Sequence, residues 1–468
     1  MAVAVSDLRT SRRSGPRLAL LALAQFVIAV DYNNVYVALP DIGAGLGFSA
    51  QSLQWVVSAY AVAFGGLLLL GGRAADRLGA RRMFVLALLT YGLSSLVGGL
   101  ATHQHVLVAA RAVQGIGGAM LLPAVLALIN TRFPEGRERN RALAVWGSTG
   151  SGGLAAGALL GGVITNAWGW PWVLLIVVPM AIGAAAAAPV LIAEDPPGRR
   201  GGGFDLLGAL VATAGVSLVV FGLVSGPEAG WVSVRGLGAL VVGTLLVLTF
   251  YVIERTVRDP LVTPALFRNR RLLTAMGVAF LHHCALSSGY YLFTVYLQNV
   301  LGYTALQAGL AFLPLGVLAM VAGGKVAVVA LNRHGVRATL ATGMSLYGVG
   351  LAALVAGMSA GGSYWAVLPG VAIYGFGGGL AFTTVFVAAS SGVAPAEQGV
   401  ASALASTSLQ MGASVGLALI LIIANSGGAV VDGLRTAGWT AAGATLLGGL
   451  LALTYRSHQA PAGGGQFL

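Results

Sequence analysis

Charged side chains are scarce in this chain: Asp, Glu, Lys and Arg make up 9% of its 468 residues, against about a quarter in an average soluble domain. Lysine is almost missing, with Lys325 alone among the 26 basic residues. So few charges cannot cover the surface of a water-soluble protein of this length, whereas a hydrophobic share of 57% suits a chain surrounded by lipid. The scarcity of charge therefore predicts an integral membrane protein.

Cysteine occurs once, at Cys284 inside an apolar run, which excludes an intramolecular disulfide and a cysteine-based metal cluster. The polar stretches between the apolar runs are too short to hold a soluble catalytic domain. No Walker-type phosphate loop accompanies the glycine runs. We therefore expect no enzyme activity, no metal site and no organic cofactor.

Long apolar runs are abundant. A helix of about 20 apolar residues crosses the ~30 Å hydrocarbon core of a bilayer, and internal Gly or Pro does not exclude such a helix. Windows of this length predict an all-α integral membrane protein with fourteen transmembrane helices. The predicted spans are residues 18–40, 52–71, 83–101, 106–130, 141–165, 171–193, 206–224, 232–253, 273–300, 305–331, 338–358, 363–391, 399–425 and 434–455.

The basic residues predict the orientation of these spans. With the N-terminus inside, nearly all of the 26 basic residues fall in the tails and loops of one side; Arg235 and Arg435 lie at outer ends, and Arg111 lies within a span. The positive-inside rule then places both termini in the cytoplasm. The net charge of +12 is thus an orientation signal and does not indicate nucleic-acid binding. The Arg-, Ala- and Gly-rich composition suggests the plasma (inner) membrane of a bacterium.

Two internal sequence repeats indicate a duplicated architecture. The loop GGRAADRLGARRMF returns in degraded form as ALNRHGVRATL, with Asn332 aligning on Asp76, and the run from Gln114 returns from Tyr374. Offsets of 256 and 260 residues fit two six-helix halves with two extra helices between them, and such repeats place the substrate at the interface of the halves. The predicted segments are a cytoplasmic tail (1–17), the first half (18–195), an inserted two-helix segment with its linker (196–255), the second half (256–456) and a flexible cytoplasmic tail (457–468).

Four stretches, in order, resemble motifs of the fourteen-span drug:proton antiporter family of the major facilitator superfamily. They are VDYNNVYVALP from Val30, GGRAADRLGARR from Gly71, RAVQGIGGAMLLPA from Arg111 and YLQNVLGYTALQAGLAFLPLG from Tyr296. The resemblance covers residues 18 to 455. It implies export of amphipathic organic compounds, such as cationic drugs, dyes or a secondary metabolite, by alternating access in exchange for protons.

The resemblance also assigns two structural motifs. The gating motif, which would latch the inner ends of the two halves through charge and helix-end contacts, comprises Gly72, Asp76, Arg77, Gly79 and Arg81. The helix-packing motif of the fifth span comprises Gly153, Gly157, Gly161 and Gly162. Ala158 and Ala144 replace a proline and a glycine of that second motif, which is associated with antiport. A merely solvated loop remains an alternative for the gating motif.

Asp31 and Arg111 are the acidic and basic residues placed well inside predicted spans. An ionised side chain at the bilayer centre costs at least ~2.5–3.5 kcal/mol unless it is paired or wet, so such residues are functional candidates. Their depths allow a direct or water-mediated pair. We expect Asp31, with Arg111, to be the proton-coupling site; the alternative is a static structural pair.

A further group of polar and aromatic residues is predicted to line the substrate cavity, because aromatic faces suit planar or cationic solutes. It comprises Gln25, Tyr32, Asn33, Asn34, Gln114, His282, His283, Tyr290, Tyr291, Tyr296, Gln298 and Phe382. His282 and His283 could titrate near neutral pH, or form a hydrogen-bonded helix contact; lipid or helix contact is the alternative for the others.

The expected partners are a small organic substrate, protons and membrane lipid, and the chain is expected to act as a monomer. Two other classes of function remain open: a facilitator or proton symporter for a small organic nutrient, and a receptor or scaffold without transport. The second of these is disfavoured, because nothing outside the membrane could signal.

Overall fold

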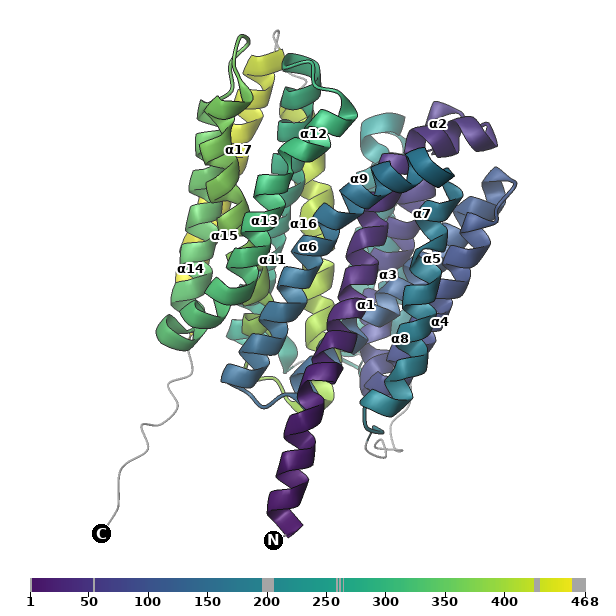
Figure 1. Ribbon diagram of the computed structural model, residues 1–468, viewed down its shortest axis with the longest axis vertical. Coiled ribbons are helices and arrows are strands. Elements are labelled where there is room, and N and C mark those ends of the chain that lie inside the picture. Colours follow the sequence, from purple (N-terminus) through teal and green to yellow (C-terminus); the bar gives the residue numbers. More distant parts are fainter. Residues whose placement is uncertain are drawn as a thin grey trace.

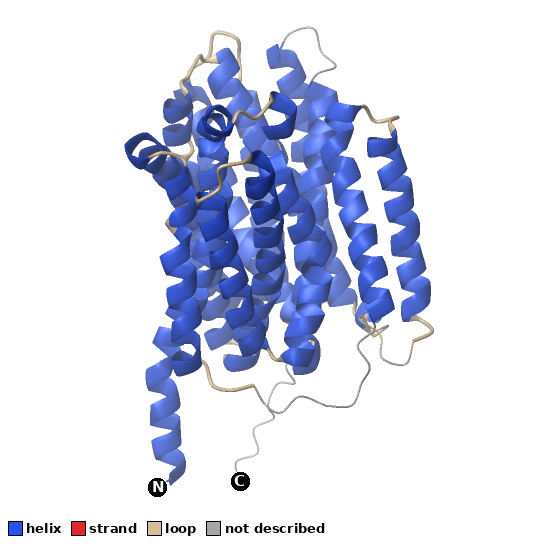
Figure 2. Cartoon of the chain, turned by 90° about the vertical axis from the view of Figure 1, so that its right-hand side faces the viewer, coloured by secondary structure: helices blue, strands red, loops and turns tan. Residues whose placement is uncertain are grey.

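The computed structural model describes residues 2–53, 55–195, 206–257, 260, 262–263, 265–424 and 430–456. This part of the chain is built of helices and connecting loops, without a strand, and the helices run along the long axis of the molecule (Figures 1 and 2). The predicted C-terminal tail at 457–468 and residues 196–205, at the start of the inserted segment, lie outside the described residues.

The first group of helices contains α1 to α8, and the bounds of its members are α1 Ala2–Leu46, α2 Ala50–Leu53, α3 Trp55–Leu78, α4 Ala80–Gly99, α5 Gln104–Arg132, α6 Arg137–Trp168, α7 Pro171–Leu175 and α8 Val177–Leu191. Within the group α1 packs on α6, and α5 packs on both α3 and α4. Helix α1 continues through Pro40 to Leu46, so it is longer than the predicted span 18–40. Asp31 therefore lies further from the end of its helix than the predicted span suggested.

A second group follows a helical pair. The pair consists of α9 Leu206–Ala229, then η1 Val234–Gly238 and α10 Ala239–Glu254. The second group comprises η2 Leu266–Arg268, α11 Arg270–Val295, η3 Tyr296–Val300, α12 Ala305–Ala311, α13 Leu313–Val321, η4 Ala322–Val326, α14 Ala327–Ala356, α15 Tyr364–Ser390, η5 Pro395–Glu397, α16 Gln398–Ala424 and α17 Val430–Leu453. Helix α9 contacts α3 of the first group and α16 of the second.

Eleven helical stretches in the described residues are long and apolar enough to cross a membrane. One of them, residues 307–356, takes in the predicted tenth and eleventh spans. These are separated at Gly335, whose backbone is non-helical (φ 75°, ψ 175°), a conformation that favours glycine. Helices α6 and α9 coincide with the predicted fifth and seventh spans and are not among the eleven.

The two groups meet along α3, α5 and α6 on one side and α13, η4, α15 and α16 on the other. In η4, a turn of π-helix, the Gly323 carbonyl accepts a hydrogen bond from Thr383 Oγ1 of α15 at 2.9 Å. The neighbouring Gly324 faces Ser148 of α6. η4 therefore lies at the seam between the groups.

One end of the bundle is rich in arginine. Helix α1 enters the bundle there (Figure 1). The helix ends at this level carry Arg77, Arg81, Arg82, Arg132 and Arg137. We call this end the basic face. The short helices α2, α7 and α12 lie toward the opposite end.

Candidate functional site

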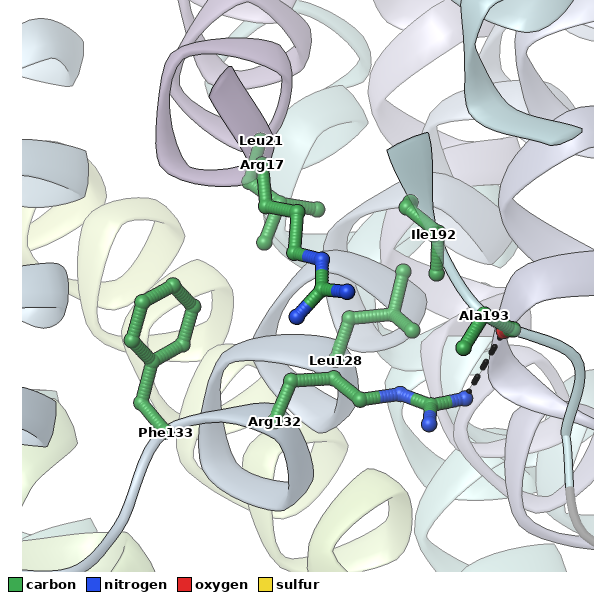
Figure 3. Close-up of a pocket in the computed structure, with 7 residues that line it drawn as sticks. All are labelled: Arg17, Leu21, Leu128, Arg132, Phe133, Ile192 and Ala193. Carbon is green, nitrogen blue, oxygen red and sulfur yellow. Dashed lines mark hydrogen bonds between the residues drawn. The ribbon is translucent and has the colours of Figure 1, made fainter. Parts of the chain in front are cut away.

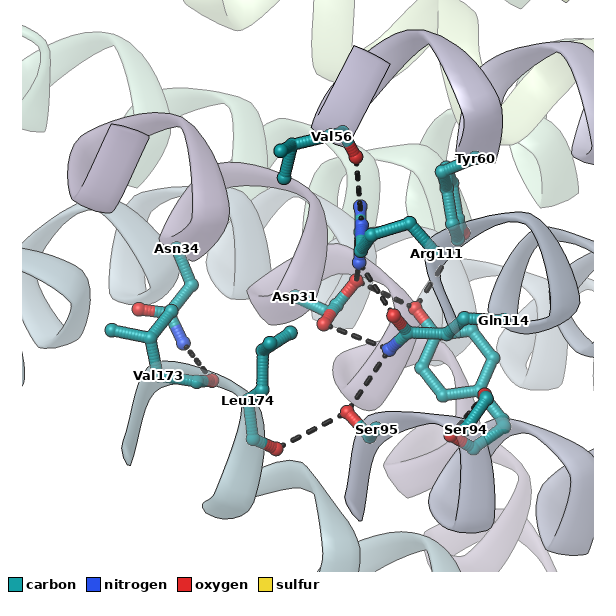
Figure 4. Close-up of polar contacts among 11 residues, drawn as sticks. Asp31, Asn34, Val56, Tyr60, Ser94, Ser95, Arg111, Gln114, Val173 and Leu174 are labelled. Carbon is teal, nitrogen blue, oxygen red and sulfur yellow. Dashed lines mark hydrogen bonds and ion pairs between the residues drawn. The ribbon is translucent and has the colours of Figure 1, made fainter. Parts of the chain in front are cut away.

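Asp31, in the middle of α1, forms an ion pair with Arg111 of α5. Arg111 Nη1 donates to Asp31 Oδ2 at 2.8 Å, and the two side chains are 2% and 0% exposed (Figure 4). Two charges removed from water in this way are stable only when they are paired and their remaining polar atoms are hydrogen-bonded. The direct pairing that the sequence allowed is therefore present.

The two charged groups make further hydrogen bonds. Tyr91 of α4 donates its hydroxyl to Asp31 Oδ2 at 3.0 Å, and Gln114 Nε2 donates to Oδ1 at 3.0 Å. Arg111 donates from Nη1 to Gln114 Oε1 at 2.6 Å and from Nε to the Val56 carbonyl at 3.0 Å. Both carboxylate oxygens thus accept hydrogen bonds, and the guanidinium reaches three helices.

Aromatic and hydroxyl groups enclose this network. The guanidinium of Arg111 lies 4.6 Å from the centre of the Tyr60 ring, a cation–π distance. Gln114 also donates to Ser95 Oγ at 3.1 Å, and Ser95 donates to the Leu174 carbonyl. Sequence reasoning missed Tyr60, Tyr91 and Ser95; the one available signal was that they are polar groups inside apolar spans.

The polar residues that follow Asp31 point in different directions. Asn33 donates to the Leu154 carbonyl of α6 at 2.7 Å, and Asn34, fully buried, donates to a backbone carbonyl of α7 at 2.8 Å. Tyr32 is 38% exposed. The structure thus brings Gln114 to Asp31, and uses both asparagines to join α1 to its neighbours.

A second cluster lies at the seam and contains a residue that the sequence reading overlooked. Trp146 of α6 is fully buried and stacks on Phe382 of α15 with 5.7 Å between ring centres; it also meets Phe386 edge-on at 4.7 Å. Its Nε1 has no hydrogen-bond partner among the described residues, and neither has Oε1 of Gln25. The Gln25 amide contacts α6 at Gly150, one turn beyond Trp146. A donor on α6 and an acceptor on the neighbouring α1 are therefore both buried and unsatisfied.

The two histidines of α11 extend this cluster. His282 lies with its Nδ1 3.1 Å from that of His283 and its Nε2 3.0 Å from the Gly378 carbonyl. The His282 ring stacks on Tyr347 at 4.9 Å, and Phe382 lies about 6 Å from both imidazoles. Phe382 thereby links the histidines to Trp146 across the seam.

The remaining predicted cavity residues lie further along α11 and η3. Tyr290 and Tyr291 are partly buried against the core. Tyr296 is fully buried, and its hydroxyl donates to the Ser359 carbonyl at 3.2 Å. Gln298 is exposed. Tyr296 therefore holds the loop after α14, and Gln298 is not brought to the cluster.

Asp76 of the gating motif reaches across to the second group. Its two carboxylate oxygens accept from the backbone N–H groups of Gly399 and Val400, each at 2.9 Å, at the start of α16. A carboxylate at a helix N-terminus satisfies N–H groups that have no partner within the helix and interacts favourably with the helix dipole. Gly72, one turn earlier, allows the close approach, because a Cβ there would lie 2.6 Å from the Gly399 carbonyl oxygen.

The other members of the gating motif hold the first group together at the basic face. Gly79 has φ +99° and permits the tight turn from α3 to α4. The Arg81 N–H donates to Asp195 Oδ2 at 3.0 Å, and its guanidinium lies 3.8 Å from Glu194. Arg77 lies in the last turn of α3.

The glycines of α6 lie along its contact with α1. A Cβ on Gly157 would lie 2.5 Å from the Val30 carbonyl oxygen, and Gly153 and Gly161 contact α1 one turn to either side; Gly162 is less crowded. Small residues of this kind allow two helix backbones to approach closely. The helix that carries Asp31 is therefore packed tightly on α6.

Residues 21–416 match the family model described as Major Facilitator Superfamily. The chain belongs to this superfamily. It is 38% identical over 435 residues to the cephamycin export protein CmcT of Amycolatopsis lactamdurans, covering 90% of this chain and 87% of that protein. It is 36% identical to the puromycin resistance protein pur8 of Streptomyces alboniger (86% and 80% covered) and 34% identical to the lincomycin resistance protein of Streptomyces lincolnensis (90% and 86%).

The fold agrees with this membership. The crystal structure of the human organic anion transporter MFSD10 (TETRAN) superposes with a TM-score of 0.71, covering 94% of this chain and 99% of that one, at 16% sequence identity. The superfamily consists of transporters, so the chain is a multi-pass membrane transporter and not an enzyme.

Proposed function

We propose that the chain is a proton-coupled exporter of amphipathic, antibiotic-like organic compounds, with Asp31 as the coupling carboxylate. The observation that carries the proposal is the buried pair of Asp31 and Arg111 with its hydrogen-bonded surroundings. Three relatives named for the export of, or resistance to, antibiotics support the substrate class. Protons serve as the coupling ion, and no other cofactor and no second subunit is required.

The proposed topology has fourteen spans in the plasma membrane of a bacterium, with the basic face in the cytoplasm. The eleven apolar stretches yield this number when residues 307–356 are divided at Gly335 and α6 and α9 are added. The arginines of the basic face support the orientation through the positive-inside rule.

The proposed mechanism alternates between two states of Asp31. In one state the carboxylate is bound by Arg111, Gln114 and Tyr91, as in this structure. Protonation removes the negative charge, weakens the ion pair and frees donors for other partners. If the carboxylate opens in turn to each side as the halves rock, protons move inward while substrate moves outward.

Substrate is proposed to bind at the seam, between the first group and α11 and α15. The unsatisfied Nε1 of Trp146 and Oε1 of Gln25 offer one donor and one acceptor, and the stacked Phe382 offers an aromatic face. A ligand with an aromatic or flat apolar part and both kinds of polar group would complete these contacts.

A nutrient facilitator or symporter is the second candidate. Ala158 and Ala144, at positions where the antiport-associated motif has proline and glycine, favour it. In that case substrate would accumulate inside vesicles together with protons, and would not be exchanged for them.

The test uses proteoliposomes with an acidic interior and an entrapped pH-sensitive dye, to which puromycin, lincomycin or a cephamycin is added outside. We expect at least one compound to release protons from native vesicles, and Asp31→Asn to abolish that release. Asp41→Asn is the matched control, since Asp41 is exposed on the same helix, and it should behave as native.

The results separate the candidates. Equal proton release by native chain and Asp31→Asn would reject Asp31 as the coupling site. Substrate and protons entering together would favour the symporter. Absence of release with all three compounds, while each is carried across down its own gradient, would show an uncoupled carrier.

A further inference from the structure

A small hollow lies at the basic face where α1, the end of α5 and the segment after α8 meet. It is small and partly open to the surroundings. Its walls are Leu21, Leu128, Phe133 and Ile192, and two arginines, Arg17 and Arg132, extend into it from different helices (Figure 3). The hollow is thus apolar at the sides and carries guanidinium groups.

These guanidinium groups keep unused donors. Arg17 donates from Nε to the Leu191 carbonyl at 2.9 Å, which leaves its terminal nitrogens without a partner among the described residues. Arg132 directs Nη2 to the carbonyls of Ala193 and Glu194, at 3.0 and 3.1 Å, and to Asp195 at 3.4 Å. Its Nε is buried and has no partner in the described structure.

The charge of the hollow is therefore not balanced. Arg132 pairs with Asp195 at 3.4 Å, whereas Arg17 has no ion pair among the described residues. Guanidinium groups bind phosphate through several N–H donors at once, in a planar geometry that lysine cannot provide. A phosphate group would therefore provide acceptors for the unused N–H donors of Arg17 and Arg132.

The depth of the hollow indicates where such a phosphate comes from. Arg17 directly precedes the predicted apolar span 18–40, Arg132 follows 106–130, and Ile192 lies at the end of 171–193, so three helices leave the hydrocarbon here. Val190, two residues before Ile192 on α8, is 73% exposed, and exposed apolar side chains at this depth face lipid. Basic pockets between helices at the membrane surface bind the headgroups of anionic lipids.

We propose that this hollow binds the phosphate of an anionic phospholipid, with Arg17 and Arg132 as its ligands and the apolar walls against the glycerol and first acyl carbons. The bound lipid would join α1, which carries Asp31, to α5, which carries Arg111. The proposal is independent of the transported compound and of which side of the membrane the basic face occupies.

The test is native mass spectrometry of the full-length chain titrated with phosphatidylglycerol and, separately, with phosphatidylcholine. Arg17→Gln and Arg132→Gln should each weaken phosphatidylglycerol binding by about tenfold or more, the loss of one charged hydrogen-bond set. Ala193→Leu keeps both charges and fills the hollow from an exposed position, so it should weaken binding too. Arg82→Gln, an exposed arginine of the same face, is the control and should bind as native.

Each alternative has its own signature. If Arg82→Gln weakens phosphatidylglycerol binding as much as the hollow variants do, the lipid responds to the general positive charge of the surface and the proposed site is wrong. Unchanged binding in all three hollow variants would overturn it as well. If millimolar inorganic phosphate displaces phosphatidylglycerol fully, the hollow is a site for free anions and the assignment to lipid is wrong.

Discussion

The two halves of the molecule pack alike and differ in charge. The sequence offsets of 256 and 260 residues place Tyr347 in the position of Tyr91 and Tyr374 in that of Gln114. In the first half Tyr91 donates to the Asp31 carboxylate. In the second, Tyr347 donates to the Tyr374 hydroxyl at 3.1 Å, which donates to a backbone carbonyl of α11 at 2.8 Å.

Arg111 has no basic counterpart at the matching position of the second half. The same offset carries Arg111 onto Val371, which is fully buried. The glycine contacts, in contrast, are kept: Gly117 approaches the backbone N of Tyr91, and Gly377 that of Tyr347. Close packing is thus common to α4 and α5 in the first half and to α14 and α15 in the second, whereas among the described residues the buried ion pair occurs in the first half.

The largest expected effect comes from removing the arginine. Arg111→Ala leaves the Asp31 carboxylate buried without its cation, and should lower the free energy of unfolding by about 3–5 kcal/mol. Val371→Ala, at the matching position, removes two methyl groups and should cost about 1–2 kcal/mol. Denaturation by SDS in mixed micelles, followed by tryptophan fluorescence, measures both.

A double variant sharpens this result. Asp31→Asn with Arg111→Gln removes both charges and should be less destabilised than Arg111→Ala alone. If Arg111→Ala costs no more than Val371→Ala, the two halves do not differ in the way we describe.

A smaller effect is expected from the shared glycines. Gly117→Ala and Gly377→Ala each force a methyl group against the backbone of the neighbouring helix and should destabilise by about 1–3 kcal/mol. Gly377 is the tighter contact and should give the larger loss. Gly183→Ala, with nothing within 4 Å of its added Cβ, is the control in the same denaturation assay. A loss in only one half would show that the packing is not shared.

The smallest expected effect is the difference between two tyrosine variants, about 1 kcal/mol. Tyr91→Phe removes a hydrogen bond to a charged acceptor and should cost about 1.5–3 kcal/mol, whereas Tyr347→Phe removes a neutral one and should cost about 0.5–1.5 kcal/mol. Thermal unfolding in detergent, monitored by circular dichroism, gives the order. Equal losses would mean that the Asp31 carboxylate is neutral in the folded chain.

Much of the architecture could be predicted from the sequence, because apolar runs of about 20 residues are a direct consequence of bilayer thickness. The pair of Asp31 and Arg111 could also be anticipated, since isolated charges at similar depth need each other. Membership of the major facilitator superfamily is confirmed; the roles assigned to individual site residues stay predictions.

Other features depend on which face of each helix turns inward, which one sequence does not reveal. Tyr60 and Tyr91 look like ordinary span residues until α3, α4 and α5 are packed together. Trp146 stacks on a residue more than two hundred positions away. Helix α1 extends to Leu46, beyond the predicted span 18–40, and Pro40 is accommodated within it.

Because η4 is a π-helical turn, the number of residues in this segment matters for the seam as much as their identity does. A π turn holds an additional residue compared with an α-helix, and each residue of an α-helix accounts for about 100° of rotation. Deletion of one residue from 322–326 would let a regular helix pass through. The deletion would rotate Ala327 and Leu331, both buried now, away from their present neighbours. The five residues of η4 therefore determine which side of the helix each residue from 327 to 335 occupies.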